Sequence, residues 1–462
     1  MDASNPIIRL PPEKMPKNFL NMAAVMGYGL PLISPMTMQP ATPDEALMIF
    51  PQGVVAQEMN FTDREIPIEN ELRAAYYYAN RPTPMHRAFR LEKALGLEGD
   101  RVKIFFKNES VSPTGSHKTN TALAQAFYAK QQGIKAIATE TGAGQWGSAL
   151  AYACALFGIE ARVYMVRASY RQKPYRGMLM RTYGATVAES PSDLTDVGKS
   201  FLEKDPEHPG SLGIAISEAV EDVVKHNDTT RYSLGSVINS VLLHQSIIGQ
   251  EAKMQMEMVK EYPDIVIGCH GGGSNFFGFS SAFLADKIDG KKDPTIIAVE
   301  SAAAPKLTRG VYKFDYGDTG HVAPIAKMYT IGSAFVPAPV HAGGLRYHGA
   351  AMLVSMALDK GLISATAKKQ TDVIEAGVLF AKTEGFVPAP ETCHAIAEAI
   401  NQAKMANDNG EKKTIAFNCS GHGYFDMAAY GDYLDGKLPD YELSDEEIQE
   451  SVALIPSIEG FQ

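Results

Sequence analysis

A lysine suited to amine chemistry stands at position 118, between a glycine-ended loop at residues 112–115 and a helical pattern. The apolar run at residues 101–106, before that loop, is typical of a strand. At the N-terminal end of a helix, Lys118 would feel the positive end of the helix dipole, and partial burial would also disfavour its charged form. Both effects favour a neutral amine, the form that makes a Schiff base. A lone lysine is more often solvated, so this prediction depends on the glycine loops that follow.

Three glycines at residues 271–273 are typical of an anion-binding loop. They follow a strand-like segment and precede Ser274, Asn275 and a helical pattern. Glycines let the backbone approach an anion closely, and the helix N-terminus supplies N–H donors. The loop lacks the Gly-Lys-Ser/Thr ending of a nucleotide-binding loop, so the sequence favours a single phosphate. The alternative is a tight strand-to-helix turn, which usually needs fewer glycines.

Residues 142–147 match the G-x-G-x-x-G pattern of dinucleotide-binding loops. Glu140 precedes them, where it would repel a pyrophosphate, and the next strand ends near Arg167 without an acidic residue for a ribose hydroxyl. An arginine there could still serve an NADP phosphate, so a dinucleotide stays an alternative. The other interpretation is that the loop N–H groups hold a substrate carboxylate, beside Glu140 as a working acid.

A third glycine turn, at residues 421–423, closes the last strand-like run. Ser420 at its start could hydrogen-bond a ligand or cap the next helix. His270, directly before the three glycines, is predicted to be a packed turn residue rather than a catalyst.

The elements that must position these residues alternate between strand, glycine turn and helix from Val102 onward. Short apolar strands alternating with helices predict parallel sheets buried on both faces, hence an α/β protein of two open-sheet domains. A ligand should then lie at the carboxyl ends of the strands. The first 80 residues predict an arm with a few helices, and the change of sheet is placed between Arg231 and Ile248. Strands are expected at residues 103–106, 136–139, 161–166, 185–187, 265–267, 296–299 and 414–417.

The composition bounds the class of protein. At 462 residues the chain is too long for one hydrophobic core. A formal net charge of −10 argues against nucleic acid or an anionic membrane as the main partner. The four cysteines have no CxxC spacing, which favours reduced thiols in a cytoplasmic protein and no metal site. Prolines and glycines interrupt the apolar stretch at residues 19–36, so neither an export signal nor a membrane span is predicted.

Several of these motifs resemble, together and in order, those of the tryptophan synthase β-chain family. The flanking sequences are closest to its second branch, the β2 or tryptophan synthase β-like group, and the similarity extends from about residue 49 to about residue 430. The family motifs are residues 115–118, 140–145, 271–275, 391–394 and 420–423, and the branch motifs are residues 81–84, 172–176, 232–236, 327–330 and 341–349.

The resemblance implies a fold-type II pyridoxal-phosphate enzyme, with the cofactor between two open-sheet α/β domains. Lys118 would bind the cofactor aldehyde and later shuttle the α-proton of the amino acid. A neutral Ser420 would face the pyridine nitrogen, which suits β-elimination and β-replacement over transamination. Glu391 would lie beside the cofactor ring. The cofactor-binding residues so implied are His117, Lys118, Gln145, Gly271, Gly272, Gly273, Ser274, Asn275, Glu391 and Ser420.

The implied reaction is the last step of tryptophan biosynthesis, a β-replacement that joins indole to L-serine or O-phospho-L-serine. Glu140 would protonate the departing β-substituent and then orient indole. Backbone N–H groups of the loop that follows would bind the substrate α-carboxylate. The substrate-binding residues so implied are Thr141, Gly142, Ala143, Gly144, Gln145 and Arg346.

Two residues depart from the main branch of the family. Trp146 stands where a histidine follows the loop glutamine, and Arg346 stands where an aspartate closes over the substrate. An arginine there could pair with a carboxylate or bind a phosphate bidentately. We therefore hypothesise that O-phosphoserine is accepted as donor. The alternative is that Arg346 makes only a structural ion pair.

The N-terminal domain is predicted at residues 1–83 and 117–243, with a mobile subdomain at about residues 135–228. The C-terminal domain, with the phosphate-binding loop, is predicted at residues 84–116 and 244–462. A cytoplasmic homodimer is expected, with a tryptophan synthase α-subunit as a further candidate partner and with neither nucleic acid nor membrane.

Three other functions stay open. Another fold-type II enzyme, such as a serine or threonine deaminase, threonine synthase or cysteine synthase, would share the lysine and the glycine loop. Glu140 ahead of the carboxylate loop favours an indole-type acceptor instead. A dinucleotide-dependent oxidoreductase would use residues 142–147, and a cofactor-binding scaffold without turnover gains no support because candidate acid and base residues are present.

Overall fold

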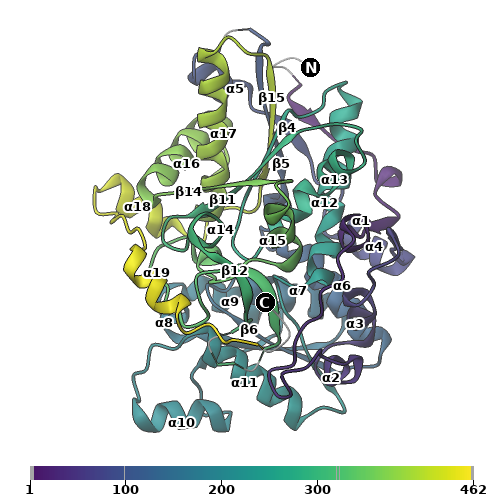
Figure 1. The fold of residues 1–462 in the computed structure, drawn as a ribbon, viewed down its shortest axis with the longest axis vertical. Helices are drawn as coiled ribbons and strands as arrows, with labels where there is room; N and C mark the ends of the chain where they lie inside the picture. The colour runs from purple at the N-terminus through teal and green to yellow at the C-terminus, as the bar shows by residue number, and fades with distance from the viewer. Residues whose placement is uncertain (1–4, 98, 319, 322, 459–462) are drawn as a thin grey trace.

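Two sheets organise the chain, and Figure 1 shows one above the other. The computed structural model describes residues 5–97, 99–318, 320–321 and 323–458. The predicted domain ranges also include residues 1–4, 98, 319, 322 and 459–462, which lie outside the described residues. The predicted α/β class is confirmed. The domain boundaries stay a prediction.

The larger sheet has the strand order β1-β4-β5-β15-β10-β11-β14. From β5 to β14 all neighbours are parallel, as predicted. β1 and β4 are antiparallel at one edge, and with two and three residues they are too short to show a pattern in the sequence. The strands are β1 (Ile7–Ile8), β4 (Met85–Arg87), β5 (Val102–Asn108), β10 (Ile265–Cys269), β11 (Thr295–Ser301), β14 (Ser364–Lys368) and β15 (Lys413–Cys419).

The smaller sheet has four parallel strands in the order β8-β7-β6-β9. Its last strand ends at Tyr232 and the next strand, β10, belongs to the larger sheet, so the predicted change of sheet is confirmed. Ala138 pairs with Tyr232, and Glu140 pairs with Tyr164. The strands are β6 (Ala136–Thr141), β7 (Glu160–Val166), β8 (Thr186–Ser190) and β9 (Thr230–Tyr232).

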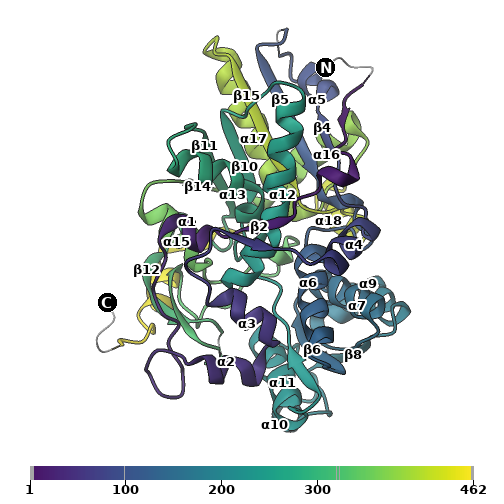
Figure 2. The ribbon, with the colours of Figure 1, turned by 90° about the vertical axis from the view of Figure 1, so that its right-hand side faces the viewer.

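Helices cover both faces of each sheet (Figures 1 and 2). Around the larger sheet, α16 and α17 lie on one side and α12 and α13 on the other. Around the smaller sheet, α7 and α9 lie on one face and α11 on the other. These helices are α7 (Gln145–Phe157), α9 (Pro174–Thr182), α11 (Leu212–Lys225), α12 (Asn239–Met258), α13 (Ser274–Ile288), α16 (Gln370–Glu384) and α17 (Pro390–Asp408). Two shorter helices, α8 (Arg167–Gln172) and α10 (Asp196–Lys204), belong to the part of the chain that forms the smaller sheet.

The N-terminal segment forms the predicted arm and helices, and further short elements complete the molecule. Two small antiparallel sheets pair β2 with β3 and β12 with β13. The elements are η1 (Pro12–Lys14), β2 (Asn18–Leu20), α1 (Met22–Met26), α2 (Pro43–Ile49), α3 (Gln52–Glu58), β3 (Glu65–Pro67), α4 (Asn70–Tyr78), α5 (Phe89–Ala94), η2 (Glu109–Val111), α14 (Lys306–Arg309), β12 (Val311–Tyr316), β13 (Ile325–Thr330), η3 (Gly343–Leu345), α15 (Met352–Asp359), α18 (Met427–Leu434) and α19 (Asp445–Val452).

Three helices begin directly after the glycine-containing loops. They are α6 (Lys118–Gln131), α7 and α13. The first N–H groups of a helix have no partner inside it, so each of these ends can bind an anion. The strand–turn–helix units predicted around the candidate residues are thereby confirmed.

Within the described part of the chain, no helix is both long enough and apolar enough to cross a membrane. Across the same residues, no group of three or more histidine, cysteine, aspartate or glutamate side chains is arranged to hold a metal ion. All four cysteines are buried and free.

Candidate active site

Lys118 is the first residue of α6, at the N-terminal end that the sequence predicted. Burial lowers the pKa of its amine below the ordinary value of 10.5, and the carboxylates of Glu391 and Glu140 act in the opposite direction. Among the described residues, no hydrogen bond or ion pair engages the Lys118 ammonium. The side chain is therefore an amine biased toward neutrality and left available for covalent chemistry.

His117 joins the start of α6 to two other loops of the site. Its Nε2 lies 3.3 Å from Ser274 Oγ, and its backbone N–H donates to the carbonyl oxygen of Ser420 at 2.9 Å. Burial, together with the charge of Lys118, lowers the pKa of the imidazole to about 3. The carbonyl oxygen of Ser420 also lies 3.2 Å from Nδ1 and can only accept, so the single N–H of the neutral imidazole donates there and Nε2 accepts from the Ser274 hydroxyl.

The three glycines after β10 leave no room for side chains. A methyl group at Gly271 would lie 2.0 Å from the carbonyl oxygen of Gly344, and one at Gly272 would lie 2.2 Å from Ser236 Oγ. Gly273 has φ of +126°, a conformation that strongly favours glycine. With the N-terminus of α13 directly behind, the loop can approach a phosphate closely.

This packing predicts the effect of adding one methyl group. Gly271→Ala must displace the Gly344 backbone and disturb the N–H groups of the loop. Loss of one charge-assisted hydrogen bond costs about 1.5–3 kcal/mol, so affinity for pyridoxal phosphate should fall by about tenfold or more. Absorbance titration of cofactor-free protein would measure it. Gly431→Ala, where nothing lies within 4 Å of the added methyl, is the matched control and should bind normally. Equal affinities would contradict the assignment of the loop.

Ser420 follows β15 and is 3% exposed. Its Oγ lies 2.7 Å from Thr392 Oγ1 and 3.5 Å from Cys269 Sγ. These neighbours are neutral, because burial raises the pKa of the Cys269 thiol to about 12. The two side chains that contact Ser420 Oγ therefore bring no charge of their own, and its role beside a pyridine nitrogen stays a prediction.

Asn275 uses its side chain inside the protein. Its Nδ2 donates to the Cys269 carbonyl oxygen at 3.0 Å, and its Oδ1 accepts from Asn418 Nδ2 at 2.6 Å. Its backbone N–H, in the first turn of α13, is the group left for an anion. If Asn275 contacts the phosphate as predicted, it does so through its backbone N–H and not through its side chain.

The loop at residues 141–145 and the segment at residues 343–346 meet at Glu391. Glu391 Oε1 accepts a hydrogen bond from Gly344 N at 2.8 Å, and Oε2 accepts one from Gln145 Nε2 at 3.3 Å. A methyl group at Gly343 would lie 2.9 Å from Ala143 Cβ. Two segments about 200 residues apart in sequence therefore lie against each other at Glu391, and the closing role of residues 343–346 stays a prediction.

Arg346 lies beside Gly343, with Nη2 3.2 Å from the position a methyl group there would take. Its Nη1 donates to the carbonyl oxygen of Ala338 at 3.4 Å, a long hydrogen bond. No carboxylate of the described residues lies within ion-pairing distance of the guanidinium; burial lowers its pKa, and the more distant carboxylate of Glu391 acts in the opposite direction. The alternative of a structural ion pair for Arg346 therefore gains no support.

Glu140 is 5% exposed, near the end of β6. Burial raises the pKa of its carboxyl to about 7, and the strongest opposing effect is a hydrogen bond from Tyr232. The Tyr232 hydroxyl donates to Glu140 Oε2. An acid that titrates near neutrality is suited to general acid and base catalysis.

Tyr232, which contacts Glu140, was not singled out from the sequence, although it belongs to one of the branch motifs. The signal lies in the parallel register of β6 and β9, which a single sequence does not display.

Three other residues that the sequence singled out, Arg167, Trp146 and His270, make contacts within the protein. Arg167 donates hydrogen bonds to the carbonyl oxygens of Pro206 and Pro191, so the guanidinium suggested for an NADP phosphate is already engaged. Trp146 donates from Nε1 to Thr139 Oγ1 at 2.8 Å, inside the smaller sheet. His270 is fully buried and packs edge-on against Phe276, as expected of a packed residue.

The combined residues fit pyridoxal phosphate. A buried, unengaged lysine amine suits its aldehyde, and the side-chain-free loop at residues 271–273 suits its phosphate. Ser420 suits its ring nitrogen. The hydrogen bonds between His117, Ser274 and Ser420 show that these parts lie in one site rather than at separate places.

Comparison with known proteins agrees with this chemistry. The pyridoxal-phosphate dependent enzyme family matches residues 76–421, and the chain is an enzyme of that class that uses pyridoxal phosphate. The tryptophan synthase beta chain of Thermococcus gammatolerans is 53% identical over 434 residues, 94% of this chain and 97% of that protein. The tryptophan synthase beta chain 2 of Aquifex aeolicus is 54% identical over 432 residues, 92% of this chain and 98% of that protein. The chain belongs to the tryptophan synthase β-chain family.

Solved structures of lower identity share the fold. O-acetyl serine sulfhydrylase isoform 3 of Entamoeba histolytica has a TM-score of 0.57 at 18% identity, covering 85% of this chain and 98% of that one. An L-serine ammonia-lyase of Rhizomucor miehei has a TM-score of 0.55 at 17% identity, covering 76% of this chain and 97% of that one. These similarities confirm the predicted fold-type II architecture.

Proposed function

We propose that this protein joins indole to L-serine or O-phospho-L-serine by a pyridoxal-phosphate dependent β-replacement that yields L-tryptophan. The observation that carries the proposal is the pair of proton-transfer groups at one site: the Lys118 amine and the Glu140 carboxyl, each shifted by burial toward its neutral form. Bound pyridoxal phosphate supplies an electron sink for negative charge at the α-carbon.

The loop at residues 141–145 would bind the α-carboxylate through its N–H groups at the start of α7. Lys118 Nζ would take the α-proton, because a neutral amine is a base. Glu140, protonated, would give its proton to the oxygen that leaves from the β-carbon. As a carboxylate it would then accept a hydrogen bond from the indole N–H and direct C3 toward the β-carbon.

Product analysis tests the proposal. Holoenzyme with serine or O-phosphoserine should form tryptophan only when indole is present, with the α-amino nitrogen retained. Pyruvate and ammonia as the sole products, with or without indole, would instead identify a deaminase.

Arg346 is proposed to select the phosphorylated donor, because its guanidinium has no carboxylate partner in the described chain. Arg346→Gln should lower kcat/KM for O-phosphoserine by about 30-fold, since a charge-assisted hydrogen bond contributes about 1.5–3 kcal/mol. The value for serine should change little. Arg171→Gln, at a side chain that is 54% exposed, is the matched control. Turnover of wild-type enzyme with serine that equals or exceeds that with O-phosphoserine would refute donor selection.

The residues at 135–228 are proposed to move as a subdomain during the reaction. Lys173 and Arg176 in this segment form ion pairs with Asp426 at 2.5 and 3.1 Å. These pairs connect the segment to the region just after Ser420, so they are the contacts that such a movement would change.

The protein is also proposed to act as a cytoplasmic homodimer. Free, buried cysteines suit a reducing compartment. Light scattering with and without a tryptophan synthase α-subunit would determine the oligomeric state and whether indole arrives free or from that partner.

A further inference from the structure

Tyr232 and Glu140 face each other because of the register of two parallel strands. Ala138 of β6 pairs with Tyr232 of β9, and side chains two residues apart in a strand lie on the same face. Glu140 is two residues after Ala138, so the side chains of Glu140 and Tyr232 lie on the same face of the sheet, with Tyr232 level with Ala138. Its hydroxyl donates to Glu140 Oε2.

The hydroxyl of Tyr232 keeps its proton and therefore acts as a hydrogen-bond donor toward Glu140. Tyr232 is 4% exposed, and burial together with the neighbouring Glu140 carboxylate raises the pKa of its hydroxyl well above 10. Its ring packs at 63° to Phe50, with 5.6 Å between the ring centroids. A side chain with two rotatable bonds that is packed in this way has little freedom to release the carboxylate.

The backbone directly after Tyr232 is fixed as well. Ser233 N donates to the Ala138 carbonyl oxygen at 3.2 Å, and Thr139 Oγ1 donates to the Ser233 carbonyl oxygen. Thr139 Oγ1 in turn accepts from Trp146 Nε1. Trp146 of α7 and Thr139 of β6 thereby fix the backbone directly after Tyr232, at the end of β9.

We propose that Tyr232 is a positioning residue for the reaction: its hydroxyl holds Oε2 of Glu140, so that Oε1 is the oxygen that exchanges a proton with the substrate. This inference rests on the proposed function. Without the tyrosine hydroxyl, the carboxyl could rotate and present either oxygen, and the proton would face the substrate for only part of the time. A fixed geometry of donor and acceptor is what general acid catalysis requires.

The same hydrogen bond stabilises the carboxylate form of Glu140. The other titratable groups that face this carboxyl are Lys118 from α6 and Tyr347 from the segment after η3, and Asp318 faces Tyr232 and Tyr347. The hydroxyl of Tyr347 donates instead to the Gly317 carbonyl oxygen at 2.6 Å. Removing the hydroxyl of Tyr232 should thus leave these charges in place and raise the pKa of Glu140.

The test is the pH profile of kcat for tryptophan formation by the holoenzyme. Tyr232→Phe should lower kcat by about tenfold, the effect of losing about 1.4 kcal/mol. Because the protonated acid is required, the high-pH limb should move up by about one pH unit, the equivalent of a similar free energy. 3-Fluorotyrosine at position 232, a stronger donor of the same shape, should move the limb in the opposite direction.

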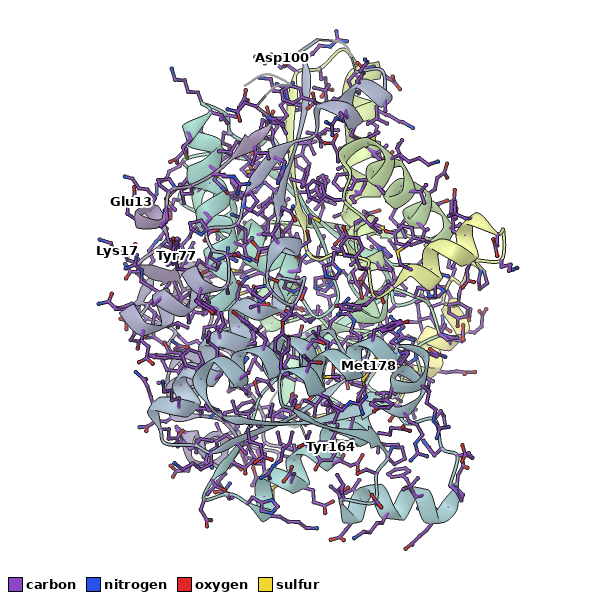
Figure 3. The ribbon with its side chains drawn as sticks, turned by 180° about the vertical axis from the view of Figure 1, so that it is seen from behind. Glu13, Lys17, Tyr77, Asp100, Tyr164 and Met178 are labelled. Carbon is purple, nitrogen blue, oxygen red and sulfur yellow. The ribbon has the colours of Figure 1, made fainter. Side chains whose placement is uncertain are left out.

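Tyr164→Phe is the matched control. Tyr164 pairs with Glu140 across the neighbouring strand and is 5% exposed, but its hydroxyl donates to Asp222 at 3.1 Å. Figure 3 labels this residue within the smaller sheet. The control should keep the wild-type limb and an unchanged cofactor absorbance.

The outcomes separate the two proposals. A wild-type enzyme that forms no tryptophan would refute the proposed function itself. An active wild-type enzyme whose limb stays fixed in both the phenylalanine and the fluorotyrosine proteins would overturn the role of Tyr232 alone. If Tyr232→Phe does not fold, the fluorotyrosine shift decides the question by itself.

Discussion

Replacing Lys118 by alanine is expected to abolish tryptophan formation, with a loss in kcat of more than about 10⁴-fold, the upper end of what general acid–base catalysis supplies alone. The variant loses both the amine that attaches the cofactor and the base for the α-proton. Borohydride reduction of the wild-type holoenzyme followed by peptide mass spectrometry should place the cofactor on the peptide that contains Lys118. The alanine variant should carry no such adduct.

Lys130→Ala provides the matched control, because it removes a lysine from the last turn of the same helix. That side chain is 47% exposed and pairs with Glu71 on the surface. It should retain both the adduct and the activity. Tryptophan formation by Lys118→Ala at a normal rate would refute the active site described above.

The parts of this protein that could be predicted from its sequence are those with local causes. A strand, a glycine turn and a helix occur within about 20 residues, and periodicity and backbone sterics express them directly. All seven apolar strands were confirmed, and so was the position of Lys118 at the start of α6. The glycines at residues 271–273 were recognisable because three in succession stand between a strand-like segment and a helical pattern.

The parts that could not be predicted depend on register and on contacts between distant segments. Tyr232 lies in a strand of three residues, and its partner Glu140 is 92 residues earlier in the chain. The hydrogen bond between Glu391 and Gly344 spans 47 residues. Neither contact can be predicted from periodicity in the sequence, because the packing of the whole domain determines which strands and loops become neighbours.

Replacing Glu140 is expected to cause the second large loss of activity. The carboxyl of Glu140 must be protonated when the β-substituent departs, because it supplies the proton to that group. With an ordinary pKa of 4.5, fewer than about 1% of carboxyls would be protonated at pH 7; with the pKa raised by burial to about 7, about half are. The wild-type rate should therefore fall as pH rises through about 7, since the proton is lost there.

Glu140→Gln keeps the shape and the capacity to accept from Tyr232 but cannot transfer a proton. It should lower kcat by about 10²–10⁴-fold and remove the limb near pH 7. Absorbance should show normal cofactor attachment, because Lys118 is intact. Exchange of the α-proton of serine into deuterated solvent should also persist, because that proton belongs to Lys118 and not to Glu140. If α-proton exchange disappeared together with tryptophan formation, the division of labour between Lys118 and Glu140 would be wrong. If exchange continued while the β-substituent stayed in place, Glu140 would be established as the acid of the elimination.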